Sequence, residues 1–251
     1  MKISKRNIFF LLGIVGLIVL IIGAITFYRW RTTDRVAAAR LDKEQLLIEN
    51  LHKNGLAIDD VNILLIALKQ EQELELYAKK KTDEVYLLVA SYPICAASGN
   101  LGPKRQSGDR QVPEGFYQID RFNPKSRFHL SLGINYPNES DKIKSQAADL
   151  GGDIFIHGSC YTIGCLPMTD DIIKEIYLYA IFARDNGQHD IPVYIFPFRM
   201  TDDNLQIHAS QHADNPVLIA FWENLKIGYD KFIFEKKALN ASVNEFGDYV
   251  F

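Results

Sequence analysis

The feature that most constrains this chain is an unbroken apolar run close to its N-terminus. The run "IFFLLGIVGLIVLIIGAITF", residues 8–27, has no charged side chain and follows Lys2, Lys5 and Arg6. An α-helix rises about 1.5 Å per residue, so a run of this length spans the roughly 30 Å hydrocarbon core of a bilayer. Cleavable signal peptides have a shorter apolar run and small residues at the cleavage site. The sequence therefore predicts an uncleaved transmembrane anchor over residues 1–30, with a signal peptide as the alternative.

Charge limits the classes of protein that remain. Basic residues lie on both sides of the run, so the positive-inside rule hardly decides which side of the membrane the rest of the chain faces. Residues 41–251 contain 21 basic and 30 acidic side chains. Binding to nucleic-acid phosphates needs clustered positive charge, and this acidic remainder therefore excludes a non-specific nucleic-acid-binding protein.

Beyond the run, the pattern predicts a helical segment followed mostly by strands. Residues 34–54 are helix-forming, polar on one side and followed by Gly55, which predicts a helical stalk over residues 31–57. Asp59 is expected to cap a second, short helix over residues 60–70. Alternating apolar and polar residues predict strands, and clusters of Gly, Pro and charge predict loops. The strands are expected at 73–80, 84–98, 116–122 and 127–136, with a long loop at 99–115 and a turn at 136–142.

The second half of the chain adds helices to these strands. Residues 153–158 predict a short buried strand, and Thr169 or Asp170 is expected to cap an amphipathic helix that runs to about Asp185. Residues 190–200 predict a strand whose Pro192 and Pro197 restrict it to an edge or a bulge. A last helix is expected over 216–234. The order lacks the regular strand–helix alternation of a doubly wound sheet and predicts one domain over residues 58–251.

The stretch "DIFIHGSCYTIGCLPMTDD", residues 153–171, has one histidine and two of the three cysteines of the chain. Cys165 lies four residues before the expected helix cap, and a helix N-terminus favours a thiolate. The dipole alone is too weak to ionise a thiol at neutral pH, and His157 is the candidate for a second partner that takes its proton. The backbone N–H groups of Gly164 and Cys165 would then form an oxyanion hole.

Other interpretations of these residues compete with catalysis. A Cys160–Cys165 disulfide would disarm the thiol outside the cytosol, and a zinc site of His157, Cys160 and Cys165 lacks a nearby fourth ligand. Cysteines are also common in cores, which is the simplest interpretation of Cys95. On composition alone a structural role is more frequent than a catalytic one, so the residues by themselves leave these alternatives open.

The segment "TIGCLPM", residues 162–168, resembles the signature of the L,D-transpeptidase catalytic-domain family. Ile163 stands where the family has a histidine, and Pro167 stands where it has Arg or Asn. The compact form "IHGSCYTIGC", together with "SGNLGPKRQSGDRQVPEGFY", "HLSLGINYPNESDK" and "FWENLKIGYDKFIFE", resembles one branch of this family, the murein peptide amidases that release lipoprotein from peptidoglycan. The resemblance covers about residues 58–237. The signature positions that match are Thr162, Gly164, Cys165, Leu166 and Met168.

The resemblance implies a fold and a set of catalytic residues. The fold would be α+β, a β-rich mixed sheet of the L,D-transpeptidase type with flanking helices, preceded here by the transmembrane helix. Cys165 would be the thiolate nucleophile and His157 its general base, oriented by the backbone carbonyl of Gly158 or Ser159. Gly164 and Cys165 would supply the oxyanion donors. The missing histidine at Ile163 favours amide hydrolysis over transpeptidation, because water needs no acceptor subsite.

The resemblance also implies a substrate and a location. The expected substrate is an amide of the peptidoglycan stem peptide at diaminopimelate, cleaved through a thioester without metal or organic cofactor, with wall-linked lipoprotein as a possible partner. The expected location is the cytoplasmic membrane, crossed once by residues 8–27, with the catalytic domain on the periplasmic side. The alternative is a catalytically silent peptidoglycan-binding or interaction domain. The candidate substrate-binding residues are Thr162, Lys104, Arg105, Arg110, Tyr136 and Asn138.

Overall fold

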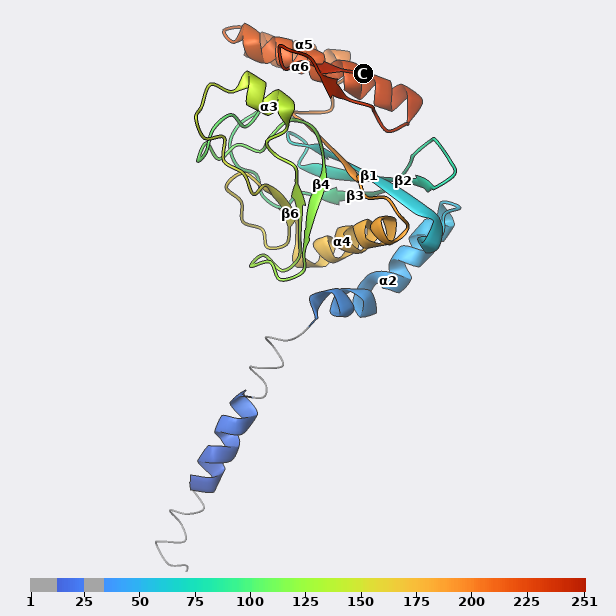
Figure 1. The fold of residues 1–251 in the computed structure, drawn as a ribbon, viewed down its shortest axis with the longest axis vertical. Coiled ribbons are helices and arrows are strands. Elements are labelled where there is room, and N and C mark those ends of the chain that lie inside the picture. Colours follow the sequence, from blue (N-terminus) through green and yellow to red (C-terminus); the bar gives the residue numbers. More distant parts are fainter. Residues whose placement is uncertain (1–12, 25–33) are drawn as a thin grey trace, which may run out of the picture.

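The computed structural model describes residues 13–24 and 34–251 (Figure 1). Residues 13–24 are helical. Within these two described ranges, no helix is both long and apolar enough to cross a membrane. The predicted anchor over residues 8–27 extends at both ends outside the described residues, so the span itself stays a prediction.

The domain is built on one mixed eight-stranded sheet with the strand order β3-β2-β1-β8-β4-β5-β6-β7. The pairs β1–β8 and β6–β7 are parallel, whereas the other neighbours run antiparallel. This arrangement agrees with the expected β-rich mixed sheet. The strands are β1 (Val61–Leu68), β2 (Glu73–Lys80), β3 (Leu87–Pro93), β4 (Gly115–Asn123), β5 (Ser131–Ile134), β6 (Phe155–His157), β7 (Leu166–Pro167) and β8 (Pro192–Phe196).

The expected short helix over residues 60–70 is wrong, because this segment is strand β1 in the middle of the sheet. Only a single 3-10 turn, Ile58–Asp60, precedes it. Successive residues of β1 point to opposite faces, and both faces are covered. Ile63 and Leu65 are buried in one core cluster, whereas Leu64 and Ile66 are buried in the other. A strand buried on both faces has a continuous apolar run, which periodicity cannot distinguish from a buried helix.

The expected edge position of the strand near residue 193 is also wrong. Strand β8 lies between β1 and β4 and pairs with both. Pro192 is the first residue of this strand, and Pro197 follows its last residue. A proline at a strand end removes no interior hydrogen bond of the ladder, so the strand can occupy the centre of the sheet.

Helices cover the sheet in two layers (Figure 1). α2 (Arg35–Lys53) and α4 (Asp170–Asp185) cover one face, whereas α5 (Asp202–Gln211) and α6 (Pro216–Glu235) lie over the other. The N-cap of α4 is Thr169, which is one of the two residues predicted for this position. The expected turn at 136–142 contains instead a short helix, α3 (Glu139–Lys144), which begins with a capping box of Asn138 and Asp141. A hairpin, β9 (Ser242–Val243) and β10 (Tyr249–Val250), ends the chain.

The segment predicted as a stalk is helical, but it is packed on the domain. Asp34 caps α2 by accepting hydrogen bonds from the N–H groups of Val36 and Ala37. Lys43 Nζ of α2 pairs with Asp171 Oδ2 of α4 at 2.6 Å. Helix α2 therefore forms part of the layer that covers the sheet. Its apolar side is buried through Ala39, Leu47 and Leu51.

Candidate active site

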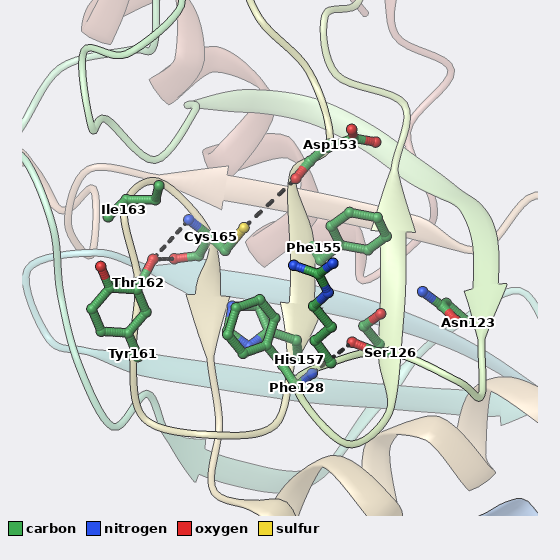
Figure 2. Close-up of a pocket in the computed structure, with 12 residues that line it drawn as sticks. Asn123, Ser126, Phe128, Asp153, Phe155, His157, Tyr161, Thr162, Ile163 and Cys165 are labelled. Carbon is green, nitrogen blue, oxygen red and sulfur yellow. Dashed lines mark hydrogen bonds between the residues drawn. The ribbon is translucent and has the colours of Figure 1, made fainter. Parts of the chain in front are cut away.

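The short parallel pair β6–β7 brings two predicted site residues, His157 and Cys165, to one side of the sheet together with Phe155. Ile156 and Leu166 are paired in register, and both side chains are buried in the core. Since alternate residues of a strand point to opposite faces, the neighbouring side chains Phe155, His157 and Cys165 point away from that core. All three line one cavity of about 400 Å³ (Figure 2). Strand register thus places the predicted nucleophile and the predicted base in the same cavity.

His157 is held in one tautomer by its own strand end. Its Nδ1 lies 2.5 Å from the carbonyl oxygen of Gly158. A carbonyl can only accept, so Nδ1 carries the proton and Nε2 is the free basic nitrogen. The ring of Phe128 lies over the imidazole, with 4.6 Å between the ring centroids. Burial lowers the pKa of His157, although the hydrogen bond to Gly158 acts in the opposite direction. The imidazole is therefore neutral and able to accept a proton at neutral pH.

Cys165 is a free, half-buried thiol. Its Sγ lies 3.7 Å from the carbonyl oxygen of Asp153, and burial raises its pKa. The expected stabilisation of the thiolate by a helix N-terminus is wrong. Strand β7 separates Cys165 from α4, and the first turn of that helix instead meets the backbone N–H of Ser159 through Asp170 Oδ1, at 2.9 Å. Burial thus favours the uncharged form of both the Cys165 thiol and the His157 imidazole over an ion pair, since it raises the pKa of the first and lowers the pKa of the second.

The hydroxyl of Thr162 organises the loop that precedes Cys165. Its Oγ1 accepts a hydrogen bond from the N–H of Cys165 at 2.8 Å and donates to the carbonyl of Cys165 (Figure 2). The same oxygen also accepts from the N–H of Gly164 at 3.1 Å. These N–H groups are the two predicted oxyanion donors. They converge on one oxygen atom, as an oxyanion hole requires, but in this structure that atom belongs to Thr162. Their role as oxyanion donors therefore stays a prediction, and in this conformation Thr162 Oγ1 occupies both N–H groups.

Cys165 lies between two cavities. The second one, of about 350 Å³, is lined by Cys165 from one side and by Lys69, Ser98 and Leu101 among others. Lys69 Nζ donates to the buried carboxylate of Glu114 and to the carbonyls of Gly102 and Val112, which holds the long 99–115 loop in place. A substrate attached to Cys165 can therefore extend in two directions.

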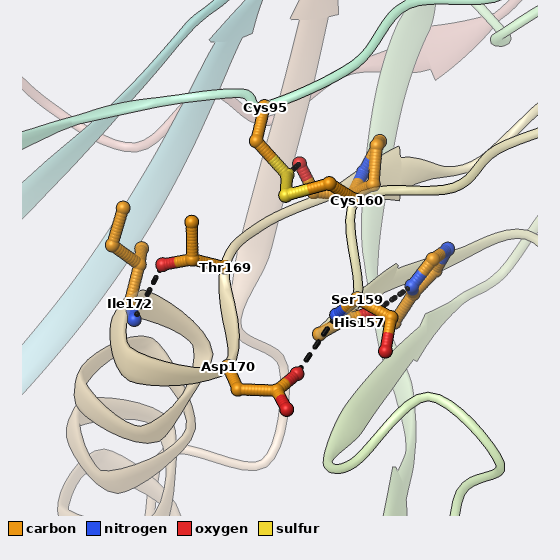
Figure 3. The surroundings of a disulfide bond; sticks show 9 residues. Cys95, His157, Ser159, Cys160, Thr169, Asp170 and Ile172 are labelled. Atoms are coloured by element: carbon orange, nitrogen blue, oxygen red, sulfur yellow. Dashed lines mark hydrogen bonds between the residues drawn. A yellow bond between two sulfur atoms is a disulfide. The ribbon is translucent and has the colours of Figure 1, made fainter.

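A disulfide joins Cys95 to Cys160, which are 65 residues apart in the sequence (Figure 3). This pairing contradicts two expectations, a Cys160–Cys165 disulfide and Cys95 as a buried core residue. Cys95 follows β3, where its N–H donates to the carbonyl of Pro167 of β7 at 3.0 Å, so the chain brings it beside Cys160. The bond leaves Cys165 reduced and ties down the loop between His157 and Cys165. It also removes Cys160 as a ligand of the alternative zinc site, and no group of three metal-ligating side chains occurs among the described residues.

The basic residues predicted for substrate binding lie outside the cavity that holds His157. Lys104 is buried and bonded to Asp109 at 2.6 Å, whereas Arg105 pairs with Asp141 at 2.7 Å. Arg110 is exposed on the long loop. These placements correct the expected role of Lys104 and Arg105, whose charges are already neutralised by protein carboxylates.

The two predicted groove residues between β5 and α3 have structural contacts. The hydroxyl of buried Tyr136 donates to the carbonyl of Leu150 at 3.2 Å, and the Asn138 amide donates to Tyr249 Oη at 2.8 Å. Neither residue lines a cavity that contains Cys165. Turn and cap formation therefore account for both of them. Of the six predicted substrate-binding residues, Thr162 lines the cavity with His157.

A loop that sequence reasoning did not single out forms the opposite wall of the first cavity. Residues 124–130, here the 124–130 loop, connect β4 to β5 and contribute Ser126, Arg127 and Phe128 to the cavity lining. The side chain of Arg35, the first residue of α2, donates to the carbonyls of Ser126 and His129. The segment directly after the predicted anchor thus holds an active-site loop in position. No local signal connects residues 91 positions apart, which is why the sequence did not reveal it.

Replacing Arg35 with Met is expected to lower kcat/KM for a peptidoglycan substrate about tenfold. The two lost hydrogen bonds are charge-assisted, and their loss releases the loop that stacks Phe128 on His157. Steady-state kinetics of the purified variants would measure the effect. The matched control is Arg40→Met, which removes an arginine of the same helix that pairs with Glu44 outside the cavity. Equal activity of the two variants would contradict the role of Arg35.

Comparison with known proteins shows the family of this chain. The model of the YkuD family, the L,D-transpeptidase catalytic domain, matches residues 62–195. An Escherichia coli K12 protein named "Putative L,D-transpeptidase YafK" is 41% identical over 177 residues, which cover 70% of this chain and 68% of that protein. The chain therefore belongs to the L,D-transpeptidase catalytic-domain family. The protein of the same name from Escherichia coli O157:H7 is similar to this chain with the same identity and coverage.

Solved structures show weaker similarity. The helical cell shape determining protein Pgp2 from Campylobacter jejuni is 18% identical with a TM-score of 0.44, over 73% of this chain and 74% of that chain. Bd1075 from Bdellovibrio bacteriovorus is 21% identical with a TM-score of 0.40, over 69% of this chain and 63% of that chain.

Proposed function

We propose that this protein is a cysteine enzyme that acts on an amide of the peptidoglycan stem peptide at diaminopimelate. The observation that carries this proposal is the placement of a reduced thiol, Cys165, and an imidazole with a free Nε2, His157, in one cavity. Membership of the L,D-transpeptidase family supports the substrate class. Nucleophile, base and the carbonyl that orients the base are the parts that covalent amide chemistry needs.

The proposed reaction starts from the neutral pair. His157 Nε2 removes the proton from the Cys165 thiol as the sulfur attacks the amide carbonyl carbon. The tetrahedral intermediate collapses when the C–N bond breaks, and the His157 imidazolium returns the proton to the leaving amine. Water, deprotonated by His157, then attacks the thioester; the C–S bond breaks and the thiol regains its proton. The N–H groups of Gly164 and Cys165 stabilise the oxyanion if the Thr162 hydroxyl rotates away from them.

The two cavities beside Cys165 support a substrate with a peptide on each side of the cleaved bond. The acyl part would lie in the cavity with His157, and the amine part in the cavity lined by Lys69 and Leu101. Ile163 is 63% exposed and lines the first cavity together with Cys165, and its apolar side chain offers no hydrogen bond to an amine that approaches the thioester. This apolar side chain favours hydrolysis over transpeptidation, so we propose a murein peptide amidase whose leaving amine can belong to wall-linked lipoprotein.

We further propose that residues 8–27 anchor the protein in the cytoplasmic membrane with the domain on the periplasmic side. The Cys95–Cys160 disulfide supports this location, because disulfides persist in oxidising compartments and are rare in the cytosol. The same bond argues against a catalytically silent binding domain, since it occupies the cysteine that would otherwise be able to block Cys165.

Digestion of purified sacculi tests the proposed function. Wild-type protein is expected to release lipoprotein or cleaved stem peptides from lipoprotein-bearing sacculi, whereas Cys165→Ala releases none. Mass analysis of muropeptides distinguishes hydrolysis from transpeptidation, because only the latter forms new cross-links. Sacculi left unchanged by the wild type and the variant alike would contradict an enzymatic role.

The neutral pair predicts a bell-shaped dependence of kcat/KM on pH. The active form has a protonated Cys165 thiol and a His157 imidazole whose Nε2 has no proton. Activity therefore falls at low pH, when the imidazole becomes protonated, and again at high pH, when the thiol ionises. Burial lowers the pKa of His157 from 6.5, which places the acid limb below that value. Burial raises the pKa of Cys165 from 9.0, which places the alkaline limb above that value. Kinetics across this range, with circular dichroism as the control for folding, would measure both limbs; an activity maximum on the acid side of 6.5 would contradict the assignment.

A further inference from the structure

The first cavity contains a permanent cation that no catalytic step uses. Arg127 lines the cavity from the 124–130 loop, opposite the β6–β7 pair that carries His157 and Cys165. Its side chain is exposed and makes no hydrogen bond or ion pair within residues 34–251. Exposed arginines often face only solvent, so the surroundings of this one decide whether it has a role.

Neighbouring cations differ from Arg127 in having partners. Arg121, at the end of β4, pairs with Asp153 at 3.0 Å, and this bond neutralises the acidic residue of the cavity lining. Lys104 and Arg105 are likewise paired with carboxylates. Arg127 is therefore the uncompensated positive charge of this cavity among the described residues.

The backbone that carries Arg127 is fixed on both sides of it. The carbonyls of Ser126 and His129 are held by Arg35, and Ser126 Oγ accepts from the N–H of Phe128 at 3.0 Å. The ring of Phe128 in turn lies against the His157 imidazole, with an angle of 31° between the ring planes. The loop also approaches Gly158 closely, since a Cβ at that position would lie 2.9 Å from the Phe128 carbonyl oxygen. The backbone from which the Arg127 side chain extends is thus fixed relative to His157, so the guanidinium stays within reach of this cavity.

The rest of the cavity wall is mostly apolar. Phe155, Tyr161 and Ile163 line it together with Phe128. Apolar walls with one unpaired guanidinium suit a ligand that has a run of methylene groups between its reacting carbonyl and a carboxylate. Diaminopimelate in a stem peptide has this form, since a short hydrocarbon chain separates its two amino-acid centres.

We propose that Arg127 is the carboxylate-binding residue of the acyl subsite and so determines specificity for an acidic stem peptide. This inference rests on the proposed function for the identity of the ligand. The carboxylate is the free carboxyl group of diaminopimelate, which stays on the acyl side of the cleaved bond and offers a planar pair of acceptors to a guanidinium.

Binding to catalytically inactive protein tests the inference independently of the reaction. The full chain with Cys165→Ala serves as the reference, and Arg127→Gln and Lys125→Gln are each added to it. Lys125 is the matched control, because it is an exposed cation of the same loop that does not line the cavity. Calorimetry would measure Kd for three muropeptides: unmodified, amidated at diaminopimelate, and amidated at the C-terminus of the stem.

Arg127→Gln is expected to raise Kd for the unmodified muropeptide about tenfold to a hundredfold, whereas Lys125→Gln changes it less than about threefold. The ligand amidated at diaminopimelate should bind the reference protein as weakly as the unmodified ligand binds Arg127→Gln, and it should lose nothing further in Arg127→Gln. The ligand amidated at the C-terminus of the stem should bind like the unmodified one. Equal affinities of the Arg127→Gln and Lys125→Gln proteins for the unmodified muropeptide would overturn the inference. The inference would also be overturned if amidation of the muropeptide raised Kd by the same factor in Arg127→Gln as in the reference protein. If the muropeptides bind as expected but wild-type protein leaves them intact, the proposed reaction fails while the carboxylate subsite stands.

Discussion

Replacing His157 with Gln is expected to lower kcat/KM at least about a thousandfold. Burial raises the pKa of the Cys165 thiol, so at neutral pH the sulfur keeps its proton unless a base removes it during the attack. Glutamine can accept a hydrogen bond but cannot take the proton. The loss should fall on kcat more than on KM, because His157 acts on the reacting atoms and its Phe128-covered ring contributes little to substrate affinity. Steady-state kinetics on a defined muropeptide would separate the two constants.

His189→Gln is the matched control, since His189 is an exposed histidine of the connection between α4 and β8. It should leave both constants unchanged. The rate of Cys165 alkylation at neutral pH provides a second measurement and should also fall in His157→Gln. If His157→Gln retained activity within tenfold of wild type, another group would have to be the base.

Removing the Cys95–Cys160 disulfide is expected to lower the free energy of unfolding by about 4 kcal/mol. The chain-entropy model gives roughly this value for a loop of the 65 residues that separate the two cysteines. The double variant Cys95→Ala/Cys160→Ala is preferable to either single variant. A single change would leave a free thiol, and Cys160 lies only five residues before Cys165 in the sequence. Urea unfolding of the double variant and of wild type, monitored by circular dichroism, would measure the difference.

The control for this experiment is Cys165→Ala, which removes a half-buried thiol without opening a covalent loop and should change stability by less than about 1 kcal/mol. The double variant is also expected to lose activity, because the disulfide holds the 158–164 loop that leads to Cys165 (Figure 3). A double variant as stable as wild type would show that the surrounding contacts alone fix this loop.

Much of the fold could be predicted because alternation and capping are local signals. Strands β2 and β4, helix α4 with its Thr169 cap, and helix α6 were all expected from short windows of sequence. The errors occurred where tertiary packing decides. Strand β1 has no polar side because helices cover both faces of the sheet. Strand β8 tolerates its prolines because they lie at or beyond its ends.

The candidate site likewise has features that nearby residues indicate and features that only the folded structure reveals. His157 and Cys165 lie eight residues apart, and one short strand pair gives them a shared face, so a single local segment was sufficient to propose both of them, and their catalytic roles stay predictions. The disulfide partner of Cys160 and the contact of Arg35 with the 124–130 loop join distant segments, and a single sequence carries no signal for either. The contact of Thr162 Oγ1 with the N–H groups of Gly164 and Cys165 is local, but the sequence did not indicate it, because a threonine near a loop has several possible backbone partners.

The central claim is that Cys165 attacks an amide carbonyl and forms a thioester. Acid quenching of wild-type protein mixed with a muropeptide, followed by intact-mass and peptide-mass spectrometry, tests it most directly. The predicted result is a transient adduct on the peptide that contains Cys165, with the mass of the muropeptide less the departed amine. The adduct should be absent from Cys165→Ala and should disappear as product forms. Product formation without any adduct on Cys165, or an adduct on a different residue, would contradict the claim.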